Sequence, residues 1–302
     1  MGRNRYILIN NNKIEVLYKG EKGPIIVILT GMGCSYDEWY EVIENLSQTN
    51  RILTFHRQGL GKSEIGEGIN NTESTVRDLA SLLSHFKIEE PIYLVGHSYG
   101  GLCAQHFAKT YPDIVAGVIL VDSTSVELKE LDNLNLPVID NESDEEWIEK
   151  CLNYAKKDTE KLSETLKPTL NDKHCHFPID IQQRLIDFQL NPLLYRAMAS
   201  EIKEWKNDAE VIKKLGDFPN IPLIVIGRDK EFTIKTEMKT GIPLWELRIF
   251  EEKWSELITN QVKLSSKSEL FFASNSGHSV FLDRPDLIID CIKRISSEYC
   301  FK

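Results

Sequence analysis

Short runs of apolar residues recur along the chain and alternate with stretches whose apolar positions follow a helical period. The later runs are dominated by Ile, Val and Leu, which is typical of strands that helices cover on both faces of a mostly parallel sheet. Strands that alternate with helices predict a doubly wound α/β architecture with right-handed crossovers. We predict eight strands, at residues 6–9, 14–18, 25–29, 52–55, 92–95, 115–121, 223–226 and 270–273.

Several segments between these strands carry helix signals. The Ser35 hydroxyl can cap a helix while Glu38, three residues later, reaches back to the cap. An apolar stripe that ends at Leu46 continues this first predicted helix. Further helices are predicted at 72–86, at 101–111 and, at the end of the chain, at about 285–299.

The alternation stops between residues 124 and 218, where the sequence offers no convincing buried strand. A segment of this length is too long to be a bare loop in a compact domain. Its apolar residues instead recur at helical spacing, around 147–155, 181–188 and 195–202. We therefore predict a helical cap at 124–218, inserted after the sixth strand, and a core formed by 1–123 and 219–302.

Composition and charge exclude several classes of function. The 302 residues are 41% hydrophobic and 27% charged, an ordinary balance for a folded protein. The formal net charge of −10 repels phosphate backbones and anionic membranes, so we expect neither nucleic acid nor a membrane as a partner. The first apolar run is too short for a signal peptide, and no window approaches the length of a spanning helix, so we expect a cytoplasmic protein.

The cysteines do not suggest a disulfide framework or a metal site. All six lie far apart and form no C-x-x-C pair, which favours reduced thiols. His174, Cys175 and His176 are adjacent, but they lack the spacing of a metal-ligand set. We expect no metal, and the sequence leaves the oligomeric state open.

One segment carries a strong chemical signal. The residues Gly96-His97-Ser98-Tyr99-Gly100 follow a buried strand and precede a helix, and this G-x-S-x-G pattern in that context is a nucleophile elbow. The glycines allow a turn so sharp that side chains there would collide with the neighbouring strand and helix. The turn exposes the Ser98 hydroxyl at a helix N-terminus, where partial positive charge favours a developing anion.

A serine hydroxyl needs a base beside it to act as a nucleophile at neutral pH. His278 lies in the loop after the last strand and before the final amphipathic helix. Loops that follow the C-terminal ends of parallel strands share one rim of the sheet with the elbow, so we predict that His278 is the base. His97 is adjacent to Ser98 in sequence and so projects elsewhere, and structural roles are the simpler interpretation for His56, His85 and His106.

With these motifs, the chain resembles serine hydrolases of the α/β-hydrolase fold over about residues 6–123 and 219–299. In this family the loop after the third strand supplies an oxyanion-hole amide, which implies the N–H groups of Met32 and Tyr99 as donors. Thr30 stands where the family often has histidine, and backbone amides do not depend on that side chain. Residues 56–63 resemble the D-x-x-G-x-G-x-S loop with His56 in place of aspartate, and we interpret Arg57 there as structural.

The resemblance implies a hydrolase without a cofactor that transfers an acyl group to water. Epoxide hydrolases and haloalkane dehalogenases of this fold attack with aspartate, whereas Ser98 occupies that position here. We therefore predict a serine hydrolase that acts on a small-molecule ester, lactone or thioester through an acyl-enzyme. Two alternatives stay open: an aminopeptidase of the proline-iminopeptidase kind, and a ligand sensor of the same fold with slow turnover.

The acid that would orient His278 has two candidates. The family usually places it after the seventh strand as G-x-x-D, yet the third position after Gly227 is Lys230, and Asp229 falls one residue short. Some members supply it from the end of the sixth strand, where this chain has Asp122. We favour Asp122 and keep Asp229 as the alternative.

Overall fold

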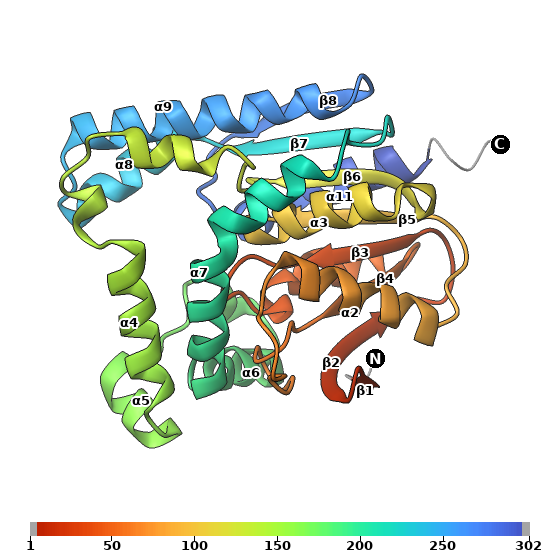
Figure 1. The fold of residues 1–302 in the computed structure, drawn as a ribbon, viewed down its shortest axis with the longest axis horizontal. Coiled ribbons are helices and arrows are strands. Elements are labelled where there is room, and N and C mark those ends of the chain that lie inside the picture. The colour runs from red at the N-terminus through yellow and green to blue at the C-terminus, as the bar shows by residue number, and fades with distance from the viewer. Residues whose placement is uncertain (1–4, 298–302) are drawn as a thin grey trace.

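The computed structural model describes residues 5–297, which form a sheet covered by helices on both faces (Figure 1). The order of the strands in the sheet is β1-β2-β4-β3-β5-β6-β7-β8, with β1–β2 and β2–β4 antiparallel and all other neighbours parallel. This confirms the predicted eight-stranded, mostly parallel sheet. The strands are β1 (Arg5–Ile9), β2 (Asn12–Lys19), β3 (Ile25–Leu29), β4 (Arg51–Phe55), β5 (Ile92–His97), β6 (Val115–Val121), β7 (Leu223–Arg228) and β8 (Ser268–Ala273).

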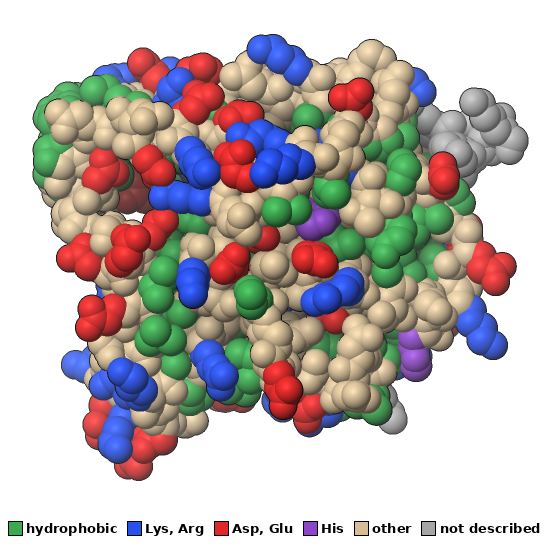
Figure 2. All heavy atoms as spheres, in the orientation of Figure 1, with side chains coloured by type: hydrophobic (Ala, Val, Ile, Leu, Met, Phe, Trp, Pro, Cys, Tyr) green, Lys and Arg blue, Asp and Glu red, His purple; other side chains and the backbone are tan. Residues whose placement is uncertain are grey.

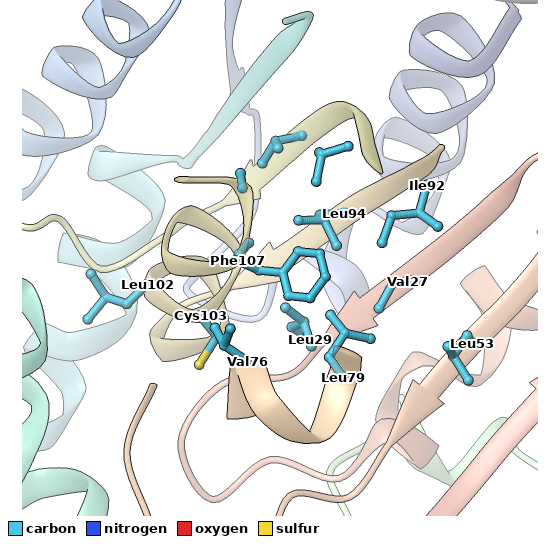
Figure 3. Packing of buried hydrophobic residues seen from close by; sticks show 14 of the residues in the cluster. Val27, Leu29, Leu53, Val76, Leu79, Ile92, Leu94, Leu102, Cys103 and Phe107 are labelled. Atoms are coloured by element: carbon cyan, nitrogen blue, oxygen red, sulfur yellow. The ribbon is translucent and has the colours of Figure 1, made fainter. Parts of the chain in front are cut away.

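The two faces of the sheet bury separate apolar layers. On one face, side chains of α2 (Thr72–His85) and α3 (Tyr99–Thr110) pack against β3, β4 and β5; Figure 3 shows Phe107 of α3 against Leu94 of β5. On the other face, α1 (Tyr40–Leu46) and α11 (Pro285–Ser297) cover the alternate strand residues. Burial of both faces is the physical reason that the central strands are apolar throughout.

The segment between β6 and β7 is helical in the structure. It contains α4 (Asp144–Ala155), α5 (Thr159–Leu166), α6 (Ile179–Gln189) and α7 (Pro192–Lys214), with short 3₁₀ turns at Leu128–Asn133, Ile139–Asn141 and His174–His176. The long helix α7 packs against both α4 and α3, so it links this segment to the sheet (Figure 1). On the face shown in Figure 2, acidic and basic side chains are interspersed, and both gather around α5.

Two details of the predicted helices differ from the structure. The helix capped by Ser35 begins as a 3₁₀ turn, Tyr36–Trp39, before α1 continues it, although the cap formed with Glu38 is present as predicted. Two helices after β7, α8 (Lys230–Glu237) and α9 (Leu244–Asn260), were not predicted. The predicted end of the last helix, residues 298–299, lies outside the described residues, as does Cys300. The remaining helical elements are Pro112–Ile114, Met238–Thr240, Gln261–Leu264 and α10 (Val280–Asp283).

Among residues 5–297, each helix is too short or too polar to span a lipid bilayer.

Candidate active site

Ser98 stands at the turn between β5 and α3 in a strained conformation. Its φ of 52° and ψ of −124° lie in a region that residues other than glycine rarely adopt. The turn is so tight that a Cβ on Gly96 would lie 2.5 Å from the carbonyl oxygen of Gly100. Only glycine therefore fits at position 96. Strand β5 and helix α3 therefore present Ser98 at the C-terminal edge of the sheet, as the G-x-S-x-G pattern predicts.

His278 reaches the same edge from the loop after β8. The carbonyl oxygen of His278 accepts a hydrogen bond from Nε2 of His97, at 3.0 Å, and the two rings lie 4.7 Å apart. Burial, together with the neighbouring His278, lowers the pKa of His97 to about 3. His97 is therefore neutral at physiological pH, and it fixes the backbone of His278 beside the elbow.

Asp122 lies against the His278 ring. Its Oδ2 is 2.6 Å from Nδ1 of His278, and its carboxylate is fully buried whereas the His278 side chain is 42% exposed. Asp122 directly follows β6, the neighbour of β5 in the sheet, and takes a positive φ of 39°. The exposed ring and buried carboxylate form the arrangement in which a carboxylate holds one imidazole nitrogen and leaves the other free.

Asp229, the alternative acid, makes other contacts. Its carboxylate caps α8 by accepting the N–H of Phe232 at 3.1 Å, and it also accepts the N–H of Asn275 at 2.9 Å. These contacts are those of a helix cap and a loop anchor. Between the two candidate acids, the structure places Asp122 at the His278 ring.

Three further groups bind the Asp122 carboxylate. Arg228 Nη1 lies 3.1 Å from Oδ2, while the indole N–H of Trp254 and the backbone N–H of Arg228 donate to Oδ1 at 2.9 and 3.2 Å. Burial raises the pKa of Asp122, but Arg228, His278 and Trp254 outweigh burial and hold this pKa well below its ordinary value. Asp122 is therefore ionised at every pH at which the protein is expected to work.

The loop after β3 passes directly beside Ser98. A Cβ on Gly31 would lie 3.2 Å from Cβ of Ser98, which is closer than ordinary van der Waals contact. A glycine at position 31 thus lets this loop approach the serine closely. Met32 lies in this loop, and Tyr99 is the first residue of α3, where a backbone N–H has no acceptor within the helix. The two predicted oxyanion-hole residues thus flank Ser98 from two separate elements.

A buried arginine holds this loop in place. Arg57 donates from Nη1 to the carbonyl oxygen of Thr30 at 2.7 Å and from Nη2 to that of Gly31 at 3.0 Å. It also forms a two-point ion pair with Glu201 of α7, at 2.7 and 3.0 Å. Arg57 therefore links the segment between β6 and β7 to the loop that carries Met32.

A cavity of about 340 Å³ opens beside His278. Its walls come mainly from α8 and α9, the two helices at the upper left of Figure 1. Polar groups at the walls include Arg228, Glu251 and Glu237. The apolar lining consists of Ile139, Phe232, Ile242, Leu247 and Phe250.

The sequence analysis did not identify Arg228, Glu251, Trp254 and Glu201, which support the site without belonging to the predicted triad. A signal was present for Glu251. It stands in phase with Leu247, Trp254 and Ile258, which places a glutamate on the buried stripe of a helix. A carboxylate in such a position is rarely buried without a cation beside it.

Comparison with known proteins agrees with the fold. A profile of the family described as alpha/beta hydrolase fold matches residues 24–204. YqjL, an uncharacterized protein of Bacillus subtilis (strain 168), is 22% identical over 270 residues, which cover 89% of this chain and 82% of YqjL.

Two solved structures share the fold. The epoxide hydrolase CorEH has a TM-score of 0.66 at 17% identity, with 99% of both chains covered. A thermophilic esterase from Thermogutta terrifontis has a TM-score of 0.64 at 18% identity, with 98% of both chains covered. At such identities these likenesses concern the fold alone.

Proposed function

Because the chain belongs to the α/β-hydrolase fold family, we propose that it is a serine hydrolase that cleaves a small carboxylic ester, lactone or thioester through an acyl-enzyme. The observation that carries this proposal is the 2.6 Å contact between Asp122 and His278, at the sheet edge where the elbow presents Ser98. A serine in this position supports acyl transfer, since the serine and its base can act as nucleophile and proton acceptor.

Each residue has a defined role in the proposed reaction. Ser98 Oγ attacks the carbonyl carbon, and His278 Nε2 takes the proton and later returns it to the leaving group. Asp122 holds Nδ1 of His278 and stabilises the imidazolium that forms. The N–H groups of Met32 and Tyr99 bind the tetrahedral oxyanion before water releases the acyl group.

The cavity beside His278 is suited to bind an apolar group of the substrate. Five apolar side chains line it, and its volume of about 340 Å³ is in the range of pockets for small ligands. An aminopeptidase would need unpaired acids to hold a substrate amine. In the acidic run 140–149, every acid except Asp144 is exposed to solvent, and Asp144 pairs with Lys206, which supports the ester over the amine.

An active-site probe tests the proposal. We expect a fluorophosphonate to label the wild-type protein and p-nitrophenyl esters to turn over. Ser98→Ala should abolish both with little change in the thermal transition, because a partly exposed hydroxyl contributes little folding energy.

Ser81→Ala is the matched control for this test. The Ser81 hydroxyl bonds within α2 to the carbonyl oxygen of Arg77, so its loss should leave labelling and turnover unchanged. Ester turnover that persists in Ser98→Ala would overturn the proposal. Labelling of wild type without turnover would favour the slow sensor instead.

A further inference from the structure

The triad acid has an unusual electrostatic environment. The guanidinium of Arg228 touches the same Asp122 oxygen that meets His278, at 3.1 Å, and both Asp122 and Arg228 are buried. An ion pair of this kind carries no net charge. An imidazolium formed at His278 would then face a neutral pair, and not the single negative charge that stabilises it in a serine triad.

Glu251 changes this balance. Glu251 is only 2% exposed, and its carboxylate accepts hydrogen bonds from Nε of Arg228 at 3.0 Å and from Nη2 of the same residue. Glu251 also lines the cavity that His278 borders. Asp122, Arg228 and Glu251 together carry one negative charge, so the cluster recovers the charge that a lone aspartate would have.

We propose that Arg228 and Glu251 are positioning residues of the triad: Arg228 orients Asp122, and Glu251 cancels the Arg228 charge so that Asp122 can stabilise the His278 imidazolium. This inference rests on the proposed serine-hydrolase function. It assigns to helix α9, which sequence reasoning did not predict, the task of setting the charge of the site.

The geometry of α9 supports this role. Glu251 and Trp254 are three residues apart and lie on the same side of the helix, Glu251 against Arg228 at the end of β7 and Trp254 against Asp122 just after β6. Trp254 donates to Oδ1 of Asp122, which leaves Oδ2 to His278 and Arg228. The Trp254 ring lies 4.5 Å from the Arg228 guanidinium carbon and meets the His278 ring edge-on at 5.9 Å. One helix thus contacts Asp122, Arg228 and the His278 ring.

Other ionisable groups near His278 are accounted for. His97 is neutral, as described above. Asp283 accepts the N–H of Gly277 and pairs with Lys173, and Glu237 of α8 lines the same cavity as His278. Burial raises the pKa of Glu251, and Arg228 opposes this shift, so the charge on Glu251 depends on the arginine.

The test compares Glu251→Gln with wild type over pH, through the rate of fluorophosphonate labelling of Ser98 and kcat/KM for a nitrophenyl ester. Glutamine keeps an acceptor for Arg228 but removes the charge. Without that charge the imidazolium is less stable, so the acidic limb of both profiles should move to lower pH by about one unit. The plateau of kcat should fall about tenfold, which is the same free energy.

Two further variants make the result decisive. Glu252→Gln removes the neighbouring exposed carboxylate of α9, and it should leave both profiles unchanged. In Arg228→Gln/Glu251→Gln, Asp122 again carries the only charge, so the acidic limb should return to that of wild type even if the rate stays low.

A Glu251→Gln profile that falls in rate without moving in pH would reduce the pair to a structural anchor and overturn the inference. A double variant that stays shifted would also overturn it. Failure of the proposed function would look different, because wild type itself would then show no labelling at Ser98.

Discussion

Two buried arginine–glutamate pairs flank Ser98, one on each side, and they are built alike. Arg57 pairs with Glu201 of α7, and Arg228 pairs with Glu251 of α9, each through two hydrogen bonds. They differ in what else the arginine touches. Arg57 donates to the neutral carbonyl groups of Thr30 and Gly31, whereas Arg228 binds the charged Asp122.

This difference separates two uses of a buried ion pair. The Arg57 pair sums to zero charge, so its effect on the site is the position of the loop that carries Met32. The Arg228 pair includes a third charge and leaves one negative charge beside His278. The cost of desolvating two charges offsets most of the attraction within a buried ion pair, so such a pair adds little net stability to the fold. We therefore interpret both pairs by their effect on the active site. We expect one to act on geometry and the other on charge.

The largest expected effect is at Asp122, on the side of the site that holds the Arg228–Glu251 pair. Asp122→Asn removes the charge that Arg228 and His278 share, and loss of a triad acid lowers turnover by about ten-thousandfold in the serine-protease template. Asp229→Asn is the matched control, because Asp229 caps α8, and it should change kcat by less than about tenfold. Steady-state kinetics on folded variants checks both values. The reverse ranking would move the acid to Asp229.

Glu201→Gln tests the pair formed by Arg57 and Glu201. It leaves the buried Arg57 without a counter-charge, so we expect the free energy of unfolding to fall by about 3 kcal/mol in urea titrations. The loop beside Ser98 should also shift, with a loss in kcat of about tenfold or more.

The comparison predicts that this loss in Glu201→Gln leaves the acidic limb of the pH profile where it is. Glu204→Gln, three residues along the same helix and only half-buried, should change neither stability nor rate. A shifted limb in Glu201→Gln would mean that the two pairs do not differ as described.

The sequence predicts the local parts of this molecule and not the contacts between distant parts. Alternating or continuous apolar runs located every strand, and the elbow located Ser98, because both signals lie within a few residues. Glu201 is 144 residues from Arg57, so no local pattern connects them.

The sequence could not decide between the two candidate acids either, because His278 is far from both of them along the chain. Asp122 and Asp229 each follow a buried strand, and only the folded sheet sets one of them at His278. Helix α9 was missed because its buried stripe contains glutamates, which lower its apparent hydrophobicity. The supporting pairs were missed for the same reason, since a buried charge looks like a surface charge until its partner is known.

The smallest effect concerns Asp208, which lies on α7 two turns beyond Glu201. Its Oδ2 accepts the hydroxyl of Tyr99 at 3.0 Å and the backbone N–H of Thr72 at 3.1 Å. Burial raises the pKa of Asp208 from 3.8 to about 6, and these hydrogen bonds offset burial only in part. Asp208 thus lies on the same side of the site as the Arg57–Glu201 pair, and it carries a charge above about pH 6.

Asp208→Asn should therefore stabilise the protein, and only at higher pH. The folded state binds this proton more tightly than the unfolded state, so its contribution to stability is fully present below the unfolded pKa and is lost as pH rises through about 6. Asparagine keeps an acceptor for Tyr99 and Thr72 and never ionises. We expect the variant to exceed wild type by about 1–3 kcal/mol in free energy of unfolding at pH 8, with the difference mostly gone at pH 4. Urea titrations at the two pH values measure it, and turnover should change little because Arg57 and Glu201 are untouched. A variant that is less stable than wild type at pH 8 would show that Tyr99 needs a charged partner. The side of the site that holds the Arg57–Glu201 pair would then depend on charge, as the side with the Arg228–Glu251 pair does.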